Sequence, residues 1–551
     1  MEFDFIIVGG GSAGCVLANK LSADRQNKVL LLEAGPESKS LKLRIPAAVL
    51  SNLNSTKFNW AFQGEPEKHL MGRRIQHDRG KTLGGSSSIN GMVFIRGHAM
   101  DFDGWQQAGC IGWGYENVLP YFKRMENYSA GGDTFRGSAG PLYVQRPNPD
   151  NPLVKAFIYA GQQAGYPVTD DINGYRQEGF GLLDSSVYQG ERWSTVRAYL
   201  DPIRNRSNLK IITGAHVHKL KFIGRLVSGV IYEDQARRIH KVNARKETIL
   251  SAGAICSPQV LMLSGIGPSQ HLEEFGINVI ANLQGVGQNL NEHPDFVIKY
   301  RCKKPVSLWP KTRPLAKAIA GIQWLFSKSG ICASNQFEVV ACLRSSAGVE
   351  YPDIQLTLTP IAVDDKTWST LPEHAFQIHI GLMRARSRGR IELRSSDPMA
   401  PPKIFVNYLS DPWDRDTMHK GVKLVREIVD QPAMSEFAGD EIFPGRGIKN
   451  SDEIDECLNS HVTTQWHLSG TARMGSENDK SAVVDPVGRV HGIGGLRVVD
   501  ASIMPTVTNG NINSPTIMIA EKLSDEILGQ PPLPKVQTNV WKNNDYEIAQ
   551  R

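Results

Sequence analysis

Short apolar runs rich in β-branched residues recur along the chain and predict buried strands. They lie at residues 3–8, 28–33, 249–254 and 496–500. Between the first two runs, apolar residues repeat at the spacing of one helix face, at Ala13, Val16, Leu17 and Leu21. Residues 3–33 are therefore expected to form a strand, a helix and a second strand in succession.

The pattern changes between residues 299 and 461, where polar and apolar positions alternate. Alternation over 353–358 and 376–380 predicts antiparallel strands, and the run 389–393 is expected to extend the same sheet. We interpret this part as a separate domain. The polar residues after about 529 are expected to form a peripheral tail.

A glycine-rich turn after the first strand indicates a dinucleotide site. Gly9 permits a tight turn, Gly11 lets the backbone approach a pyrophosphate, and Gly14 lets helix and strand pack closely. The N-terminus of the following helix offers N–H groups to the phosphates. Glu33 ends the second strand, where a carboxylate accepts hydrogen bonds from ribose hydroxyls.

Two further stretches are rich in small residues. Residues 79–90 combine glycines and serines and suit a large planar or phosphorylated molecule. The strand at 249–254 ends in small residues, and Ser257 and Pro258 after it predict the start of a helix.

Composition narrows the class of protein. Hydrophobic residues make up 40% and charged residues 21% of the 551 residues, which is typical of globular proteins of two or more domains. A formal charge of +6 without a dense basic tract argues against a nucleic-acid partner. Seven scattered cysteines without a CxxC pattern indicate a reducing compartment. Neither a signal peptide nor a membrane-spanning run is recognisable, so a cytoplasmic location is expected.

The best candidate for acid/base chemistry is His467, in a glycine-rich segment late in the chain. An imidazole titrates near neutrality and suits removal of a hydroxyl proton. Asn513 precedes Ser514 and Pro515, which are expected to be the N-cap and first residue of a helix. Asn513 would then lie where negative charge is stabilised.

The other histidines do not predict a metal site. His216 and His218 share one face of a predicted strand, but no third ligand accompanies them at metal spacing. His293 is interpreted as a structural hydrogen-bonding residue. The sequence gives no support to an α/β-hydrolase.

Together these motifs resemble those of the glucose–methanol–choline (GMC) oxidoreductase family, and most closely its bacterial choline dehydrogenase and aliphatic alcohol dehydrogenase branch. The resemblance covers residues 3–528. The matching motifs are Gly9-x-Gly11-x-x-Gly14 with Glu33, the run 79–90, Ala252-Gly253, His467-x-x-Gly470-Thr471-x-x-Met474-Gly475, and Asp500 with 511–516.

The resemblance implies an α/β fold with two domains. One is a Rossmann-like FAD-binding domain that is discontinuous in sequence, and the other is a substrate domain built on an antiparallel sheet. The expected FAD domain comprises 1–150, 195–298 and 462–530. The expected substrate domain comprises 151–194 and 299–461, followed by the tail 531–551.

The resemblance also implies roles for individual residues. His467 would be the base and Asn513 its partner in the oxidation of a primary alcohol to an aldehyde by hydride transfer to flavin N5. FAD contacts are expected from Gly9, Gly11, Ser12, Ala13, Gly14, Glu33, Ala34, Trp60, Arg79, Leu83, Gly85, Asn90, Gly91, Met92, Val93, Val217, Ala252, Gly253, Trp466, Asp500, Ala501, Asn513 and Thr516.

Several positions depart from the family pattern. Leu468 and Ala472 stand where the family often has proline and cysteine, and Asp78 stands where proline is common. These departures weaken assignment to the choline subgroup. Ile89 stands where some members attach FAD through a histidine, so non-covalent FAD is expected.

The sequence leaves several alternatives open. Electrons are expected to pass to a quinone or another non-oxygen acceptor, but an oxidase that uses oxygen, a choline dehydrogenase, a FAD-binding lyase and a non-catalytic FAD-binding protein are alternatives. Residues 303–326 are basic and then apolar, which suits either contact with the inner face of a membrane or a lid of the substrate domain. The sequence does not indicate an oligomeric state.

Overall fold

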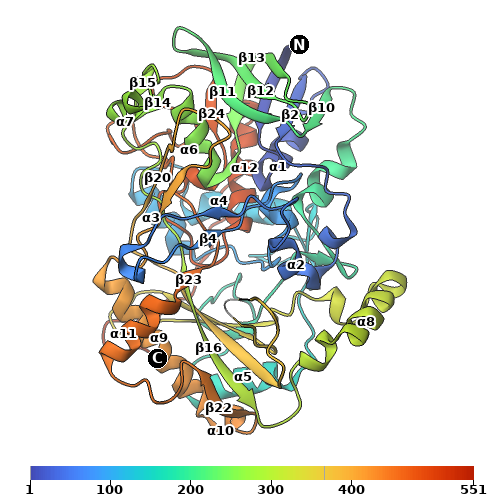
Figure 1. The fold of residues 1–551 in the computed structure, drawn as a ribbon, viewed down its shortest axis with the longest axis vertical. Coiled ribbons are helices and arrows are strands. Elements are labelled where there is room, and N and C mark those ends of the chain that lie inside the picture. The colour runs from blue at the N-terminus through green and yellow to red at the C-terminus, as the bar shows by residue number, and fades with distance from the viewer. Residues whose placement is uncertain (1, 365–366) are drawn as a thin grey trace.

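Two seven-stranded sheets organise the computed structural model, which describes residues 2–364 and 367–551 (Figure 1). The first sheet has the strand order β10–β2–β1–β13–β12–β11, with β24 beside β13. Its strands are β1 (Glu2–Val8), β2 (Val29–Glu33), β10 (Leu209–Thr213), β11 (His216–Ile223), β12 (Leu226–Glu233), β13 (Ile239–Leu250) and β24 (Leu496–Val498). Strands β1 and β2 run parallel and are joined by α1 (Ser12–Leu21), which confirms the expected strand–helix–strand unit.

The parallel part of this sheet is covered by helices. In β1, the residues from Asp4 to Val8 are all buried, as expected for a strand with both faces covered. Helix α12 (Asn513–Ile527) packs against both α1 and α4 (Tyr115–Met125). The first and last parts of the chain therefore share one core (Figure 1).

The second sheet has the strand order β22–β16–β19–β18–β17–β7, with β23 beside β16. Every pair in it is antiparallel, which confirms the strands predicted at 353–358 and 376–380. Its strands are β7 (Gly179–Leu182), β16 (Pro294–Cys302), β17 (Val339–Leu343), β18 (Ile354–Thr359), β19 (Ala375–Leu382), β22 (Ala438–Phe443) and β23 (Thr463–Thr464). Helices α5 (Pro152–Gln163), α9 (Pro412–Val429) and α10 (Pro432–Ser435) lie beside it, and α11 (Ser451–His461) leads into β23.

The expected extension of this sheet by residues 389–393 was wrong. Strand β20 (Arg390–Glu392) pairs instead with β21 (Lys403–Phe405) in a separate two-stranded sheet. Backbone hydrogen bonds from Ile391 N–H to Gly287 O (2.7 Å) and from Leu290 N–H to Gly389 O (3.0 Å) hold this segment away from the second sheet.

Strand β16 also bears on the expected domain boundaries. It spans residues 294–302, so the boundary placed at 298 falls inside one strand of the second sheet. Strand β23, expected in the FAD domain, likewise pairs with β16. The chain therefore passes from one sheet to the other close to residues 293 and 465.

Two helices begin earlier than their sequence signals predict. Helix α12 starts at Asn513, so Ser514 is a buried residue of its first turn and not the expected N-cap. Helix α6 (Gly253–Leu263) starts ahead of Pro258, and the Asp500 carboxylate accepts hydrogen bonds from Gly253 N–H (2.8 Å) and Ser257 Oγ (2.6 Å). The Asp500 carboxylate thus caps the N-terminus of α6, because it accepts a hydrogen bond from a backbone N–H group that has no partner within the helix.

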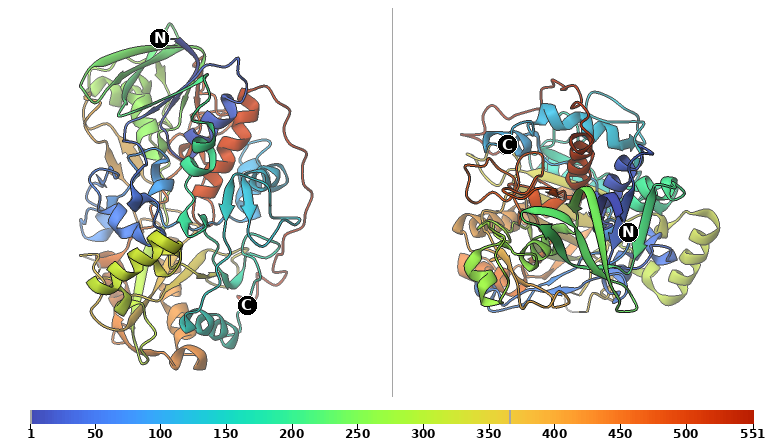
Figure 2. Two further views of the ribbon diagram at one scale, coloured as in Figure 1. Left: turned by 90° about the vertical axis from the view of Figure 1, so that its right-hand side faces the viewer. Right: turned by 90° about the horizontal axis from the view of Figure 1, so that it is seen from above.

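The C-terminal tail runs along the outside of the molecule and touches both halves (Figure 2). Leu533 N–H donates to the hydroxyl of Tyr121 (3.1 Å), near α12. The buried Arg344 guanidinium donates to the carbonyl of Ala549 (3.0 Å) and to that of Gln550. The expected peripheral extension is therefore docked at both ends.

Candidate active site

A large cavity lies between the two sheets, with a volume of about 1420 Å³. Its wall includes the glycine turn after β1, the start of α6 and the segment ahead of α12. The wall also includes residues of β16, β18 and β19. Both sheets therefore contribute to one chamber.

The glycine turn forms part of the cavity wall. A Cβ atom on Gly9, whose φ is +101°, would lie 2.5 Å from Ser251 O, and one on Gly14 would lie 1.9 Å from Gly9 O. Gly11 differs, because its nearest protein neighbours would be 3.9 and 4.0 Å from an added Cβ and it faces the cavity. The first turn of α1 has no side-chain cap, so it presents N–H groups suited to a phosphate.

Glu33 lies beside this turn on the cavity wall. Its carboxylate accepts hydrogen bonds from Gly10 N–H (2.9 Å) and Gly35 N–H (2.7 Å). Burial raises the pKa of Glu33 to about 7, against the opposing effects of these N–H groups and of Lys81. Each carboxylate oxygen retains a lone pair that can accept from a ribose hydroxyl.

Most of the expected FAD contacts lie on the cavity wall. The wall includes Gly9, Gly11, Ser12, Ala13, Glu33, Ala34, Trp60, Arg79, Gly85, Asn90, Gly91, Met92, Val93, Val217, Ala252, Gly253, Trp466, Asp500, Ala501, Asn513 and Thr516. The remaining two, Gly14 and Leu83, lie behind it, where Leu83 is fully buried and packs close to Gly10. Gly14 and Leu83 therefore contribute to the packing behind the cavity wall and do not form its surface.

Polar atoms without partners indicate that the cavity suits a polar ligand. Within the described residues, Arg79 Nη2, Trp466 Nε1 and Asn511 Oδ1 are buried and have no hydrogen-bond partner. All three residues lie on the wall. Burying such groups without a partner is costly, so a ligand that satisfies them would bind favourably. Gly253 adds an open position, since a Cβ there would meet no atom within 4 Å.

His467 lies on the cavity wall, against the segment ahead of α12. Its Nε2 atom is 3.0 Å from Asn511 Nδ2, and its Nδ1 atom is 3.0 Å from His293 Nδ1. An amide nitrogen can only donate, so Nε2 accepts and the ring proton resides on Nδ1. Burial, with smaller effects of His293 and Arg79, holds the pKa of His467 well below its usual value. The ring is therefore neutral near pH 7, with a lone pair on Nε2.

Glu292 fixes the backbone on both sides of this histidine pair. One carboxylate oxygen accepts from the N–H groups of His293 (2.8 Å) and His467 (2.7 Å), and the other accepts from Thr464 Oγ1 (2.8 Å). Burial raises the pKa of Glu292 to about 7, although Arg79 and these donors lower it. A single buried carboxyl thus ties the two segments that carry the imidazoles.

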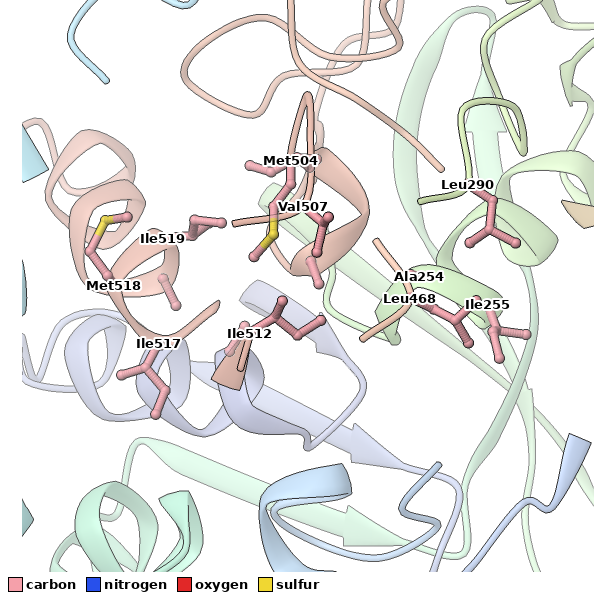
Figure 3. Packing of buried hydrophobic residues seen from close by; sticks show 14 of the residues in the cluster. Ala254, Ile255, Leu290, Leu468, Met504, Val507, Ile512, Ile517, Met518 and Ile519 are labelled. Atoms are coloured by element: carbon pink, nitrogen blue, oxygen red, sulfur yellow. The ribbon is translucent and has the colours of Figure 1, made fainter. Parts of the chain in front are cut away.

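Leu468, next to His467, packs into the protein core. It is 1% exposed and belongs to the core that also contains Ala254, Ile255 and Leu290 (Figure 3). Leu468 and His467 both line the cavity, so this packing anchors the segment that carries the candidate base.

The expected pairing of His467 with Asn513 was wrong, because the structure places Asn511 against the imidazole. Asn513 is the first residue of α12, and its Oδ1 atom accepts from Ser12 Oγ (2.8 Å) beside the glycine turn. The two asparagines therefore face different parts of the cavity. The sequence signals placed the start of α12 after Asn513. Because the helix begins at Asn513, the side chain of this residue is turned away from the preceding loop.

Sequence reasoning also missed Glu292 and treated His293 only as a hydrogen-bonding residue. The signal available was the polar run Asn289 to His293 within an otherwise apolar context. His293 does form a hydrogen bond, but its partner is the candidate base. Elsewhere, the described residues contain no group of three or more His, Cys, Asp or Glu arranged to hold a metal ion.

The part of the cavity lined by the second sheet has a polar wall. Asp295 accepts from His379 Nδ1 (2.8 Å) and from Gln465 Nε2 (3.1 Å). Aromatic rings also line it, including Trp368 and Trp466, whose centroids are 6.1 Å apart. This end can accommodate an organic molecule that carries both polar and apolar groups.

Comparison with known proteins identifies the family. The N-terminal GMC oxidoreductase profile matches residues 3–295, and the C-terminal profile of the same family matches residues 385–520. The chain therefore belongs to the GMC oxidoreductase family, as its motifs predicted. Two curated proteins named oxygen-dependent choline dehydrogenase, from Brucella ovis and Sinorhizobium fredii, are each 46% identical to it over 551 residues, or 100% of both chains.

Solved structures of similar proteins confirm the fold class. Pyridoxine 4-oxidase from Mesorbium loti has a TM-score of 0.87 at 29% identity, over 96% of this chain and 100% of that chain. A formate oxidase variant from Aspergillus oryzae, studied for its FAD modification, has a TM-score of 0.89 at 26% identity, over 96% and 98%. The α/β fold with a Rossmann-like FAD domain and a substrate domain is confirmed, and FAD is the cofactor.

Replacing Gly11 with valine should impair FAD binding without unfolding the protein. The backbone of Gly11 has an ordinary φ of −79°, and an added Cβ meets no protein atom closer than 3.9 Å. A branched side chain would instead occupy cavity space at the phosphate end. Purified Gly11→Val should show a lower ratio of flavin to protein absorbance, with an unchanged circular dichroism spectrum.

Gly104→Val is the matched control, because an added Cβ on Gly104 meets no atom within 4 Å and the residue lies outside the cavity wall. Equal flavin content in the two variants would contradict the placement of the pyrophosphate at Gly11.

Proposed function

We propose that the protein oxidises a primary alcohol to an aldehyde at the His467 end of the cavity. Bound FAD would supply the acceptor for the two electrons that leave with the carbinol hydrogen. The observation that carries this proposal is the neutral His467 imidazole, whose Nε2 lone pair lies beside Asn511 on the cavity wall. The same cavity continues to the glycine turn, where a dinucleotide would bind.

The proposed role of His467 is to accept the hydroxyl proton at Nε2. Asn511 Nδ2 donates to that atom at 3.0 Å, so a bound alcohol would have to displace this hydrogen bond. Its oxygen would then donate to His467 Nε2 and accept from Asn511 Nδ2. An N–H donor at this point stabilises the negative charge that develops as the proton leaves.

Asn513 has a different proposed role. Its contact with Ser12 places it at the junction of α1 and α12, on the part of the wall that adjoins the glycine turn. We therefore assign Asn513 to FAD binding, together with the other wall residues expected to contact the cofactor.

Choline is the first alcohol to test. Its support is the full-length similarity to the two proteins named oxygen-dependent choline dehydrogenase. A cationic alcohol also favours aromatic faces with a carboxylate nearby, and the wall carries Trp368, Trp466 and Asp295. Against this, Asp295 already accepts from His379 and Gln465. Aliphatic and aromatic primary alcohols are the other candidates.

The proposed electron acceptor is a quinone or another non-oxygen acceptor in the cytoplasm or at the inner face of a membrane. The names of the two relatives make oxygen the principal alternative. A lyase that binds FAD without a redox change is a third reading of the same cavity.

Steady-state assays with choline, a medium-chain alcohol and an aromatic alcohol test this proposal directly. Each alcohol is supplied once with an artificial dye acceptor and once with oxygen alone. We expect dye reduction and aldehyde formation with at least one primary alcohol, and slower oxygen uptake with the same alcohol. Faster oxygen uptake would identify an oxidase. Neither dye reduction nor oxygen uptake with any of the alcohols would contradict the proposed oxidation and leave the FAD-binding lyase as the alternative.

Substitutions on the cavity wall separate the proposed roles. His467→Gln should lower kcat by about 10²–10⁴-fold, because it removes a positioned base. Asn511→Ala should lower kcat roughly 10–100-fold, since it removes a hydrogen bond to a charged group. Asn513→Ala should mainly lower flavin content.

His69→Gln is the control for these variants, because His69 lies outside the cavity wall. Turnover at the wild-type rate by His467→Gln would refute the assignment of His467 as the base.

FAD is proposed to bind without a covalent link. Ile89, which stands where some family members carry the linking histidine, is a buried apolar residue on the cavity wall and offers no nucleophile. Acid denaturation should therefore release FAD into the supernatant. Flavin absorbance that stays with the precipitated chain would contradict this proposal.

A further inference from the structure

Helix α8 (Pro314–Ser327) exposes an apolar face to solvent. Leu315, Ile319, Ile322 and Phe326 are 75%, 58%, 55% and 89% exposed. Residues three or four apart lie on the same helix face, so these four side chains form one continuous stripe. A surface helix ordinarily turns its apolar stripe toward the core, and α8 does the opposite.

The opposite face of α8 fixes this orientation. Trp324 is fully buried, and its Nε1 atom donates to Gly190 O (2.7 Å). Ala320 is also buried, and the Lys328 ammonium lies 3.7 Å from the centre of the Trp324 ring. The helix is thus held by one face, and rotation to hide the apolar stripe would break these contacts.

The segment that carries α8 is basic, although two of its cations, Lys304 and Lys328, pair with Glu436 and Glu191 from elsewhere in the fold. Residues 303–337 contain six Lys or Arg residues and no Asp or Glu. Lys311, Arg313 and Lys317 gather around the start of the helix, and all three are exposed. An apolar stripe bordered by basic residues is the pattern of helices that lie in the interface of an anionic bilayer.

Helix α8 also borders the active-site cavity. Lys317, Ala320 and Gly321 line the cavity on one side, and Leu50 of α2 (Val49–Leu53) lines it on another. In the ribbon, α8 projects from the side of the lower half, with α2 above it (Figure 1). The same projection is visible after a quarter turn (Figure 2).

We propose that α8 docks the protein on an anionic phospholipid surface, with its apolar stripe at the boundary between headgroups and acyl chains. The basic residues at the start of the helix would contact lipid phosphates. This arrangement would turn the α8 side of the cavity toward the bilayer, so that amphiphilic molecules could enter from the lipid. Among the described residues, no helix is long and apolar enough to cross a membrane, so the contact would be peripheral.

Charge favours a lipid surface over a second copy of the chain. Two α8 stripes packed face to face would bring Lys311, Arg313 and Lys317 of each copy into one shared interface. No acidic residue within 303–337 is available to offset that repulsion. Anionic headgroups supply the missing negative charge, and each basic residue near such a surface adds to the attraction.

Co-sedimentation of the FAD-loaded protein with vesicles tests the proposal. One set of vesicles contains phosphatidylcholine alone, and the other contains phosphatidylcholine mixed with phosphatidylglycerol. The wild-type protein should bind the mixed vesicles, less strongly at high salt, because salt screens the attraction. The double variant Ile319→Glu with Phe326→Glu should bind at least tenfold more weakly, with unchanged flavin content and thermal midpoint.

The matched control is Ile223→Glu with Leu226→Glu, at the turn between β11 and β12. These residues are 71% and 51% exposed, and the change in net charge is the same. The control should keep wild-type binding. An equal loss of vesicle binding in both double variants would show that the loss reflects net charge alone, and it would overturn the proposal. So would absence of vesicle binding by the wild type, or a wild-type dimer that the α8 variant disperses. None of these readouts depends on the reaction catalysed.

Discussion

The buried carboxyl of Glu292 is the interaction on which the site depends. It accepts hydrogen bonds from the backbone N–H groups of His293 and His467 and from the Thr464 hydroxyl. These residues come from segments about 170 positions apart in the chain. Three hydrogen bonds to one carboxyl in a dry environment fix the backbone on which both imidazoles are mounted. The contact between His467 Nδ1 and His293 Nδ1 follows from that placement.

A second set of contacts brings the ends of the chain together at the cavity. Strand β24 runs parallel to β13, and Asp500 at its end accepts from Gly253 N–H at the start of α6. Helix α12 then packs on α1, so that Asn513 meets Ser12. The late histidine segment and the early glycine turn thereby face one chamber. Both line the same cavity, although more than 450 residues separate them.

Features of the fold and the site that depend on residues close together in the sequence could be predicted, and features that depend on distant residues could not. The strand–helix–strand unit, its glycine turn and Glu33 were predictable, because each follows from local pattern and spacing. His467 could be singled out as a candidate base by residue type and context. The choice between Asn511 and Asn513 could not be made, because it depends on where α12 begins. That start, like the start of α6, is set by tertiary contacts rather than by a local cap.

Two other features were hidden for the same reason. Residues 390–392 have the pattern of a strand, but hydrogen bonds that join Gly389 and Ile391 to residues 287–290 decide which sheet they enter. The tail is polar, yet Arg344 holds its last carbonyl groups from within the second half of the molecule. In each case a distant partner decided the outcome, and a single sequence does not show which partner a segment meets.

The role proposed for Glu292 is to hold His467 in place as the proton acceptor, and a double-mutant cycle on the reductive half-reaction tests this role. Flavin bleaching by an active alcohol would be followed anaerobically in the wild type, Glu292→Ala, His467→Gln and the double variant, each at matched flavin content. If Glu292 acts through His467, each single variant should slow bleaching and the double variant should be about as slow as His467→Gln alone. A wild-type rate in Glu292→Ala, or effects that multiply in the double variant, would contradict that claim.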